Sequence, residues 1–155
     1  MIIEKLRPEH VLQTAALQQQ IVPYHIDPDF AVKHYETMVH QPDCIVLVAR
    51  EGDEILGTVS GFVCRGLAGS FLTIEDLIVQ KHLRGKGIGR QLMSAMDDFG
   101  RSRDCCYALL VSSGFRKRAH HFYETIGYTE DVRGTGLYPK WVMAWGSVLP
   151  LIKQK

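Results

Sequence analysis

The sequence has little of several features that would decide its class at once. Its four cysteines, in 155 residues, form no Cys-x-x-Cys pair and have no paired histidines nearby, which argues against a metal site and a disulfide framework. No stretch approaches the ~18 apolar residues of a membrane span, and the amino-terminus has no cationic start followed by a long apolar run. We therefore expect no metal, no membrane partner and a cytoplasmic location.

The sequence also has no large excess of positive or negative charge. Lys and Arg number 18 and Asp and Glu 17, so the formal net charge is +1. No overall field then draws the chain to nucleic acid, and any anion-binding site must be local. With 46% apolar residues, the chain is long enough for one core and too short for two ordinary domains. We expect one domain over residues 1–145 and a tail at 146–155.

Apolar spacing, glycines and prolines predict seven strands and four helices. The strands are expected at residues 2–5, 44–50, 55–64, 71–79, 106–111, 128–132 and 141–145. The helices are expected to begin at Pro8, Pro28, Ile88 and about Arg116, and the third to end at Gly100. Turns at Gly52 and at residues 66–69 predict that the second, third and fourth strands are antiparallel. A turn-rich loop is expected at residues 133–140.

The most specific segment runs from Val79 to Arg90, where a strand turns through three glycines into an amphipathic helix. Glycines allow close backbone approach, and a helix N-terminus carries about half a positive charge, so consecutive N–H groups can hold a phosphate. The spacing fits neither the Walker loop GxxxxGK[ST] nor the dinucleotide fingerprint GxGxxG. The alternative is a plain glycine turn between strand and helix. The cations of this segment are Arg84, Lys86 and Arg90.

Arg84-x-x-Gly87-x-Gly89, directly after a strand, resembles the pyrophosphate-binding segment of the GNAT superfamily of N-acetyltransferases, which bind acetyl-coenzyme A (acetyl-CoA). Ala119 to Tyr128 (AHHFYETIGY) is similar to the family's AxxFYExxGF segment, in the right order and about thirty residues later. The resemblance implies an α/β (α+β) GNAT fold. This is a mixed, mostly antiparallel, twisted sheet of about seven strands flanked by four helices and splayed between the fourth and fifth strands.

The resemblance also implies a cofactor site. In the family the pantetheine arm runs beside the strand that precedes the glycine loop, so the backbone of Leu77 and Val79 should bind it, with the Val79 N–H facing the thioester oxygen. The alternative for both side chains is simple core packing. The cofactor residues expected on this basis are Leu77, Ile78, Val79, Arg84, Gly85, Lys86, Gly87, Ile88, Gly89, Arg90 and Ser113.

Two residues are candidates for proton transfer. Glu75 shares a strand face with Leu77 and Val79 by the two-residue period, whereas Asp76 should point to the other side of the sheet, so Glu75 is the expected base. The alternative is a carboxylate on a solvated face. The resemblance assigns Tyr123 as general acid for the departing thiolate, and the alternative is a core tyrosine. Arg116 stands where the family often has an asparagine that contacts the cofactor.

The resemblance implies that the acceptor binds at the loop between the first two helices, residues 24–27, and at residues 133–140. The candidate substrate residues are Tyr24, His25, Asp27 and Glu75. The carboxylates of Asp27, Asp29, Glu75 and Asp76 would favour a cationic amine. The alternative for the carboxylates at a helix start is that they cap the helix. The function expected is acetyl transfer from acetyl-CoA to a primary amine by direct attack in a ternary complex. The alternatives are a non-catalytic acyl-CoA sensor and, third, a nucleic-acid module. We expect an amine partner, no nucleic acid, and allow for a homodimer.

Overall fold

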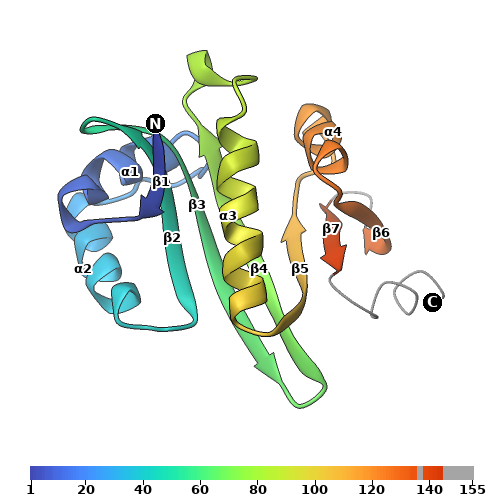
Figure 1. The fold of residues 1–155 in the computed structure, drawn as a ribbon. Coiled ribbons are helices and arrows are strands. Elements are labelled where there is room, and N and C mark those ends of the chain that lie inside the picture. The colour runs from blue at the N-terminus through green and yellow to red at the C-terminus, as the bar shows by residue number, and fades with distance from the viewer. Residues whose placement is uncertain (136–137, 145–155) are drawn as a thin grey trace. The chain divides into compact units, whose positions relative to one another are not determined.

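The computed structural model describes residues 1–135 and 138–144 (Figure 1). These residues form seven strands and four α-helices, with short 3-10 turns at Pro8–His10 and Lys81–Leu83. The helices are α1 (Val11–Gln18), α2 (Pro28–Val39), α3 (Ile88–Ser102) and α4 (Lys117–Thr125). The strands are β1 (Ile2–Lys5), β2 (Cys44–Glu51), β3 (Glu54–Gly66), β4 (Gly69–Val79), β5 (Cys105–Val111), β6 (Thr129–Thr135) and β7 (Tyr138–Ala144).

The strands form one mixed sheet in the order β1-β2-β3-β4-β5-β7-β6. Among the described pairs, β4 and β5 are parallel, and β1 with β2, β2 with β3, β5 with β7 and β6 with β7 are antiparallel. The parallel register runs from Ser70 to Ile74 of β4, and β4 then continues to Val79. The predicted fold class, a mostly antiparallel seven-stranded sheet with four helices, is confirmed.

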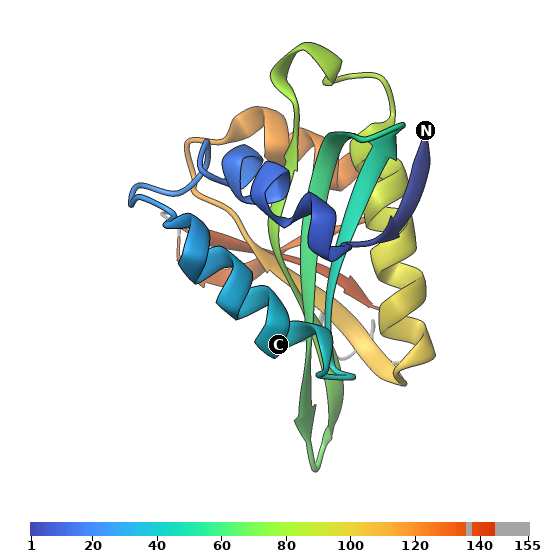
Figure 2. The same ribbon diagram turned by 90° about the vertical axis from the view of Figure 1, so that its left-hand side faces the viewer.

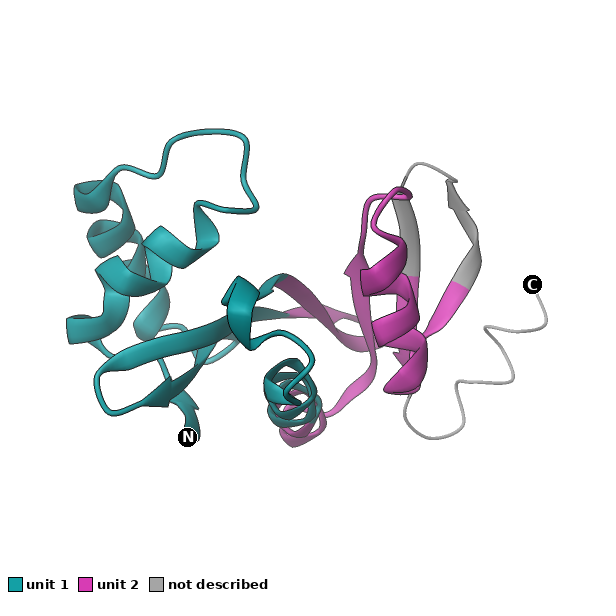
Figure 3. Cartoon of the chain, turned by 90° about the horizontal axis from the view of Figure 1, so that it is seen from above, with its two compact units in different colours: residues 1–62, 76–97 teal, residues 63–75, 98–155 magenta. Residues whose placement is uncertain are grey.

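The chain divides into two compact units (Figure 3). Unit 1 comprises Met1–Phe62 and Asp76–Asp97, and unit 2 comprises Val63–Glu75 and the chain from Asp98 onward. In unit 1, α1 and α2 lie over one face of β2 and β3 (Figure 2). A buried cluster there consists of Leu17, Val48, Ile55 and Ile78, with Leu6 and Ile21 packed against it.

Helix α3 packs on β3 within unit 1 at unusually short range. A Cβ added at Gly61 would lie less than 3.0 Å from the sulfur of Met96, and one added at Gly57 would lie 3.1 Å from Leu92 Cδ1. Real Cβ atoms essentially never come closer than 3.0 Å to another residue. Gly61 therefore allows the helix to approach the strand.

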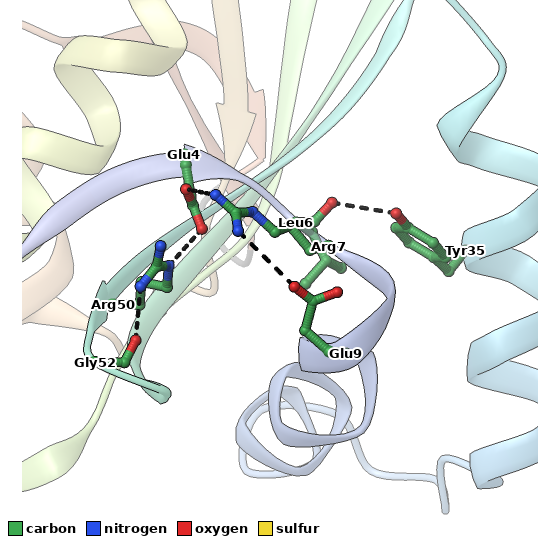
Figure 4. A network of polar contacts seen from close by, with 7 residues as sticks. All are labelled: Glu4, Leu6, Arg7, Glu9, Tyr35, Arg50 and Gly52. Atoms are coloured by element: carbon green, nitrogen blue, oxygen red, sulfur yellow. Dashed lines mark hydrogen bonds and ion pairs between the residues drawn. The ribbon is translucent and has the colours of Figure 1, made fainter.

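A polar network fastens β1 to its neighbours in unit 1 (Figure 4). The Glu4 carboxylate accepts hydrogen bonds from Arg7, at 2.8 Å, and from Arg50 Nε, and Arg50 also donates to the Gly52 carbonyl oxygen at 2.7 Å. The Tyr35 hydroxyl of α2 donates to the Leu6 carbonyl oxygen at 3.3 Å. These contacts join β1, the β2–β3 turn and α2.

In unit 2, α4 contributes Tyr123 to a core that also contains Leu72, Leu110, Tyr128 and Trp141, all buried. The rings of Phe71 and Tyr107, on the paired strands β4 and β5, stack with centroids 5.2 Å apart. Trp141, on β7, is opposite Leu110 of β5.

Three predictions about elements need correction. The first α-helix does not begin at Pro8, because Pro8–His10 forms a 3-10 turn and α1 begins at Val11. Helix α3 does not end at Gly100 but continues to Ser102, because Gly100 remains helical and the left-handed residue that follows the helix is Asp104, with φ of +57°. Most of the loop predicted at 133–140 lies in β6 and β7, because pairing between these strands outweighs the local turn preference. The predicted Trp145 strand end and the 146–155 tail lie outside the described residues.

Candidate active site

The glycine loop joins the end of β4 to α3, both in unit 1. Gly85 and Gly87 have φ of +82° and +83°, and an added Cβ at either would meet no atom within 4 Å. Glycine is therefore needed here for the left-handed backbone rather than to relieve crowding. Gly89, the third glycine, lies inside α3.

The start of α3 presents backbone donors to this loop. The Gln91 N–H donates to the Gly87 carbonyl oxygen at 3.1 Å, and the amides of Ile88 and Gly89 precede this first turn of the helical ladder. The first amides of an α-helix have no acceptor within the helix, and they carry the positive end of its dipole. The segment therefore has the backbone donors that an anion site needs, and its binding of an anion remains a prediction.

The loop is held in place by contacts that sequence analysis did not anticipate. Gln80 Nε2 donates to Glu54 Oε1 at 3.1 Å and to the Ile55 carbonyl oxygen at 2.6 Å, and the Gln80 N–H donates to the Leu56 carbonyl oxygen at 2.9 Å. These bonds tie the chain just after β4 to the start of β3. The loop is thus ordered by its own unit, which lowers the cost of ordering it around a ligand.

Arg84 makes a local contact of its own. Its Nε donates to the Val79 carbonyl oxygen at 3.1 Å, so the side chain folds back onto the last residue of β4. The guanidinium thereby stays beside the strand end and the glycine loop. Its predicted part in cofactor binding remains a prediction.

Strand β4 has a strained residue close to its end. Asp76 has φ of +56°, a left-handed conformation that costs a non-glycine residue about 1–2 kcal/mol. Two-residue alternation requires an extended backbone, so with this φ it no longer places Asp76 on the opposite face of the sheet, nor Glu75 on the face of Leu77 and Val79. Asp76 is exposed, yet partial desolvation of its carboxyl raises its pKa. Beyond it, Ile78 is buried and Leu77 and Val79 are half-buried.

Unit 2 brings the predicted acid and base within electrostatic range of one another. Tyr123 is 5% exposed, and burial raises the pKa of its hydroxyl. The positive charge of Arg116 lowers that pKa, and the negative charge of Glu75 raises it further. The net direction is upward, so the phenol stays protonated at neutral pH. Tyr123 is therefore a core tyrosine that keeps its proton among charged groups, and its part as general acid remains a prediction.

The rings around Tyr123 hold it in place. Its centroid lies 5.6 Å from that of Phe122, 5.9 Å from Trp141 and 6.3 Å from Tyr128. The backbone N–H of Tyr128 also donates to the Tyr123 carbonyl oxygen at 3.0 Å. Such packing leaves the phenol little freedom to move.

The turn before α4 has an unexpected support. The Ser113 carbonyl oxygen accepts from the Arg116 N–H at 3.0 Å and from His120 Nε2 at 2.9 Å, which assigns the proton to that nitrogen. His120 is buried, and its ring centroid lies 5.1 Å from that of Trp141. His120 thus fixes the segment that carries Ser113, a predicted cofactor residue. No spacing rule marks a histidine for this task.

The candidate acceptor residues of unit 1 lie between α1 and α2. Tyr24 is 66% exposed and His25 is exposed. Asp27 is the N-cap of α2, because its Oδ1 accepts from the Phe30 N–H at 2.9 Å. That contact supports the capping interpretation of Asp27. Glu75, the fourth candidate, belongs to unit 2.

Over residues 1–135 and 138–144, no group of three or more His, Cys, Asp or Glu side chains is placed to hold a metal ion. Within the same residues, none of the helices combines the length and the apolarity that crossing a bilayer requires.

Comparison with known proteins decides the family. The model of the acetyltransferase (GNAT) family matches residues 9–128, which include the glycine loop, Glu75 and Tyr123. The chain belongs to the GNAT acetyltransferase family. The predicted family is thereby confirmed.

Individual relatives of this GNAT acetyltransferase match over shorter stretches. Streptothricin acetyltransferase of Streptomyces lavendulae is 42% identical over 67 residues, covering 43% of this chain and 35% of that protein. The uncharacterized N-acetyltransferase YhfO of Bacillus subtilis (strain 168) is 28% identical over 95 residues, covering 57% of this chain and 61% of that protein. The chain thus spans about a third and three-fifths of the length of these two curated relatives.

A solved structure supports the fold. A putative acetyltransferase from Agrobacterium tumefaciens str. C58 superposes with a TM-score of 0.79 at 21% identity, covering 87% of this chain and 97% of that one. At this level of identity the likeness shows the fold alone.

GNAT acetyltransferases use acetyl-CoA as co-substrate. The residues of the glycine loop suit the diphosphate of that molecule, because two left-handed glycines and the first amides of α3 occur in one segment with three cationic residues. These cationic residues are Arg84, Lys86 and Arg90. When bound, acetyl-CoA would supply the thioester to be attacked.

Proposed function

We propose that this GNAT acetyltransferase transfers the acetyl group of acetyl-CoA to a primary amine by direct attack in a ternary complex. The observation that carries the proposal is the loop between β4 and α3. Gly85 and Gly87 are left-handed there, the helix begins at Ile88, and Gln80 holds the loop against β3. An ordered anion site next to a strand end is what a diphosphate-bearing thioester requires.

The backbone of Leu77 and Val79 would bind the pantetheine arm. In this role the Val79 N–H donates to the thioester oxygen as negative charge develops on it. A preorganised backbone donor of this kind contributes several kcal/mol to the lowering of a barrier. The Gln80 bonds to β3 support this placement, because they hold the residue that follows Val79.

The attacking amine must be neutral. A free alkylammonium has a pKa near that of lysine, about 10.4, so deprotonating it at pH 7 costs roughly 4 to 5 kcal/mol. Glu75 serves as the base that lowers this cost, directly or through one water molecule. Its carboxylate is exposed and close enough to Tyr123 to raise the pKa of the phenol, which supports a place among the reacting groups.

The departing thiolate needs a hydrogen-bond donor. Proton transfer from a phenol of pKa about 10 to a thiolate of pKa about 8.5 is uphill by roughly 2 kcal/mol. Burial raises the pKa of Tyr123 and makes complete transfer still less favourable. Tyr123 therefore acts chiefly by hydrogen bonding to sulfur as charge develops there.

The acceptor is an amine-bearing small molecule or peptide. The similarity to streptothricin acetyltransferase covers 43% of this chain, which makes streptothricin one acceptor to test. Spermidine, L-lysine and a short lysine-containing peptide represent the polyamine, amino acid and protein classes. A cytoplasmic location and a homodimer remain predictions, for cell fractionation and light scattering to test.

The test is release of free thiol from acetyl-CoA in the presence of each of these four amines. We expect amine-dependent thiol release with at least one of them, above the rate without amine, and a product heavier by one acetyl group in mass spectrometry. Coenzyme A binding with no amine-dependent release from any of the four would contradict the proposed enzyme and favour an acyl-CoA sensor.

A further inference from the structure

A single side chain organises the connection between α1 and α2. Gln19 Nε2 donates to the Tyr24 carbonyl oxygen at 2.8 Å, and Gln19 Oε1 accepts from the Ile26 N–H at 2.7 Å. The amide therefore bonds the backbone on both sides of His25. A side-chain amide has one acceptor oxygen and an NH2 donor group, and here both are used on one short segment.

Gln19 is itself well anchored. It is the C-cap residue of α1, and its N–H donates to the Ala15 carbonyl oxygen at 2.9 Å. Ile21 packs against the buried cluster of unit 1, and Asp27 caps α2. The connection is thus held at one end by the C-terminus of α1, at the other end by the N-terminus of α2, and in its middle by Gln19.

The side chains that this arrangement holds are turned to solvent. Tyr24 is 66% exposed and His25 is exposed. Ordering an exposed loop costs backbone entropy of about 1–2 kcal/mol per residue, and burial of these two side chains does not offset it. Gln19 therefore fixes the backbone beneath two exposed aromatic groups, where burial does not account for the order.

We propose that Gln19 is a positioning residue for the acceptor, which sets the backbone of Tyr24 to Ile26 so that Tyr24 and His25 meet the amine substrate. The inference rests on the proposed function and deepens it, because it assigns to one residue the shape of the acceptor loop. Gln19 touches neither the reacting atoms nor the glycine loop in this scheme. It acts through the residues that it holds.

The test replaces Gln19 by methionine, which keeps the length of the side chain and removes both hydrogen bonds. Gln20, exposed and next in sequence, gives the matched control Gln20→Met. Steady-state kinetics are measured with whichever of the four amines the wild type turns over fastest. The amine is varied at saturating acetyl-CoA, and acetyl-CoA is then varied at saturating amine.

We expect Gln19→Met to raise the KM for the amine about tenfold, the scale of two ordinary hydrogen bonds, with kcat and the KM for acetyl-CoA within about twofold of the wild type. Gln20→Met should leave all three constants unchanged. If Gln19→Met does not fold, Gln19→Glu carries the test, because its near-isosteric carboxylate accepts from Ile26 but cannot donate to Tyr24 at neutral pH.

An unchanged KM for the amine in an active, folded Gln19 variant would overturn the proposal. An equal rise in both KM values would also overturn it, because the effect would then be general. These failures differ from failure of the proposed function, in which the wild type itself releases no thiol in response to an amine.

Discussion

Replacing Gly87 by alanine separates the backbone geometry of the glycine loop from its charges. Gly87 has φ of +83°, and an added Cβ would meet nothing within 4 Å, so the substitution acts through the backbone alone. Gly52, in the β2–β3 turn, has φ of +57° and equally open surroundings. Gly52→Ala is therefore the matched control, with a similar backbone penalty away from the loop sequence.

The magnitudes follow from these geometries. A left-handed alanine costs about 1–2 kcal/mol in the folded state, and the reduced freedom of the unfolded chain returns about 0.4–1 kcal/mol, so each variant loses roughly 1 kcal/mol of stability. For a protein of this size that lowers the Tm by about 2–4 °C. In Gly87→Ala, a peptide that rotates to relieve the strain also turns one backbone N–H away from the phosphate. The lost hydrogen bond to a charged group contributes about 1.5–3 kcal/mol to binding.

The assay is calorimetric titration with coenzyme A beside thermal unfolding of the same samples. We expect Gly87→Ala to weaken the Kd for coenzyme A at least about tenfold, and Gly52→Ala to leave it unchanged at a similar loss of Tm. Equal affinity of Gly87→Ala and Gly52→Ala for coenzyme A would show that the left-handed backbone at Gly87 does not contribute to binding.

Three further variants test the acid, the packing and the β1 network. Tyr123→Phe should lower kcat by about 100-fold, the lower end of the range for general acids, with the Kd for coenzyme A within about twofold; an unchanged kcat removes the role assigned to the phenol. Gly61→Ala should lower the free energy of unfolding in urea by about 1–3 kcal/mol, because the new methyl overlaps the Met96 sulfur, and equal stability would contradict the close packing of α3. The hydrogen bond from Arg50 is the main cause of the lowered pKa of Glu4, so Glu4 contributes stability above its ordinary pKa of 4.5, and this contribution is lost as the pH falls through the lowered value. The Tm difference between the wild type and Glu4→Gln should therefore be present at pH 7 and shrink below pH 4.5, and an equal difference at pH 3 would contradict it.

Local signals in the sequence predicted much of this fold because they act within a few residues. Asp27 followed by Pro28 marks the start of α2, and the structure shows the expected cap. Gly52 and Gly127 mark a hairpin turn and the end of α4, and both have positive φ. The glycine loop belongs to the same class, since its geometry depends on the chain immediately around it.

Contacts between distant segments were not predictable in this way. The bond from Gln80 to the start of β3 depends on how elements pack, and the shorter-range bond from His120 to Ser113 depends on how the turn before α4 folds. Both residues lie inside the segments that the sequence singles out, but those motifs do not specify these contacts. The left-handed conformation of Asp76 is another case, because an alternating strand pattern assumes that every residue is extended. The apolar residue Phe30 of α2 is 57% exposed, although helical spacing alone does not distinguish it from a buried one.

The central claim is that the main-chain amides after Leu83 bind the diphosphate of acetyl-CoA. A crystal structure of the protein with coenzyme A tests this most directly. We predict diphosphate oxygens within hydrogen-bonding distance of the N–H groups of Gly87, Ile88 and Gly89. A diphosphate bound elsewhere, with these amides facing only solvent, would contradict the account.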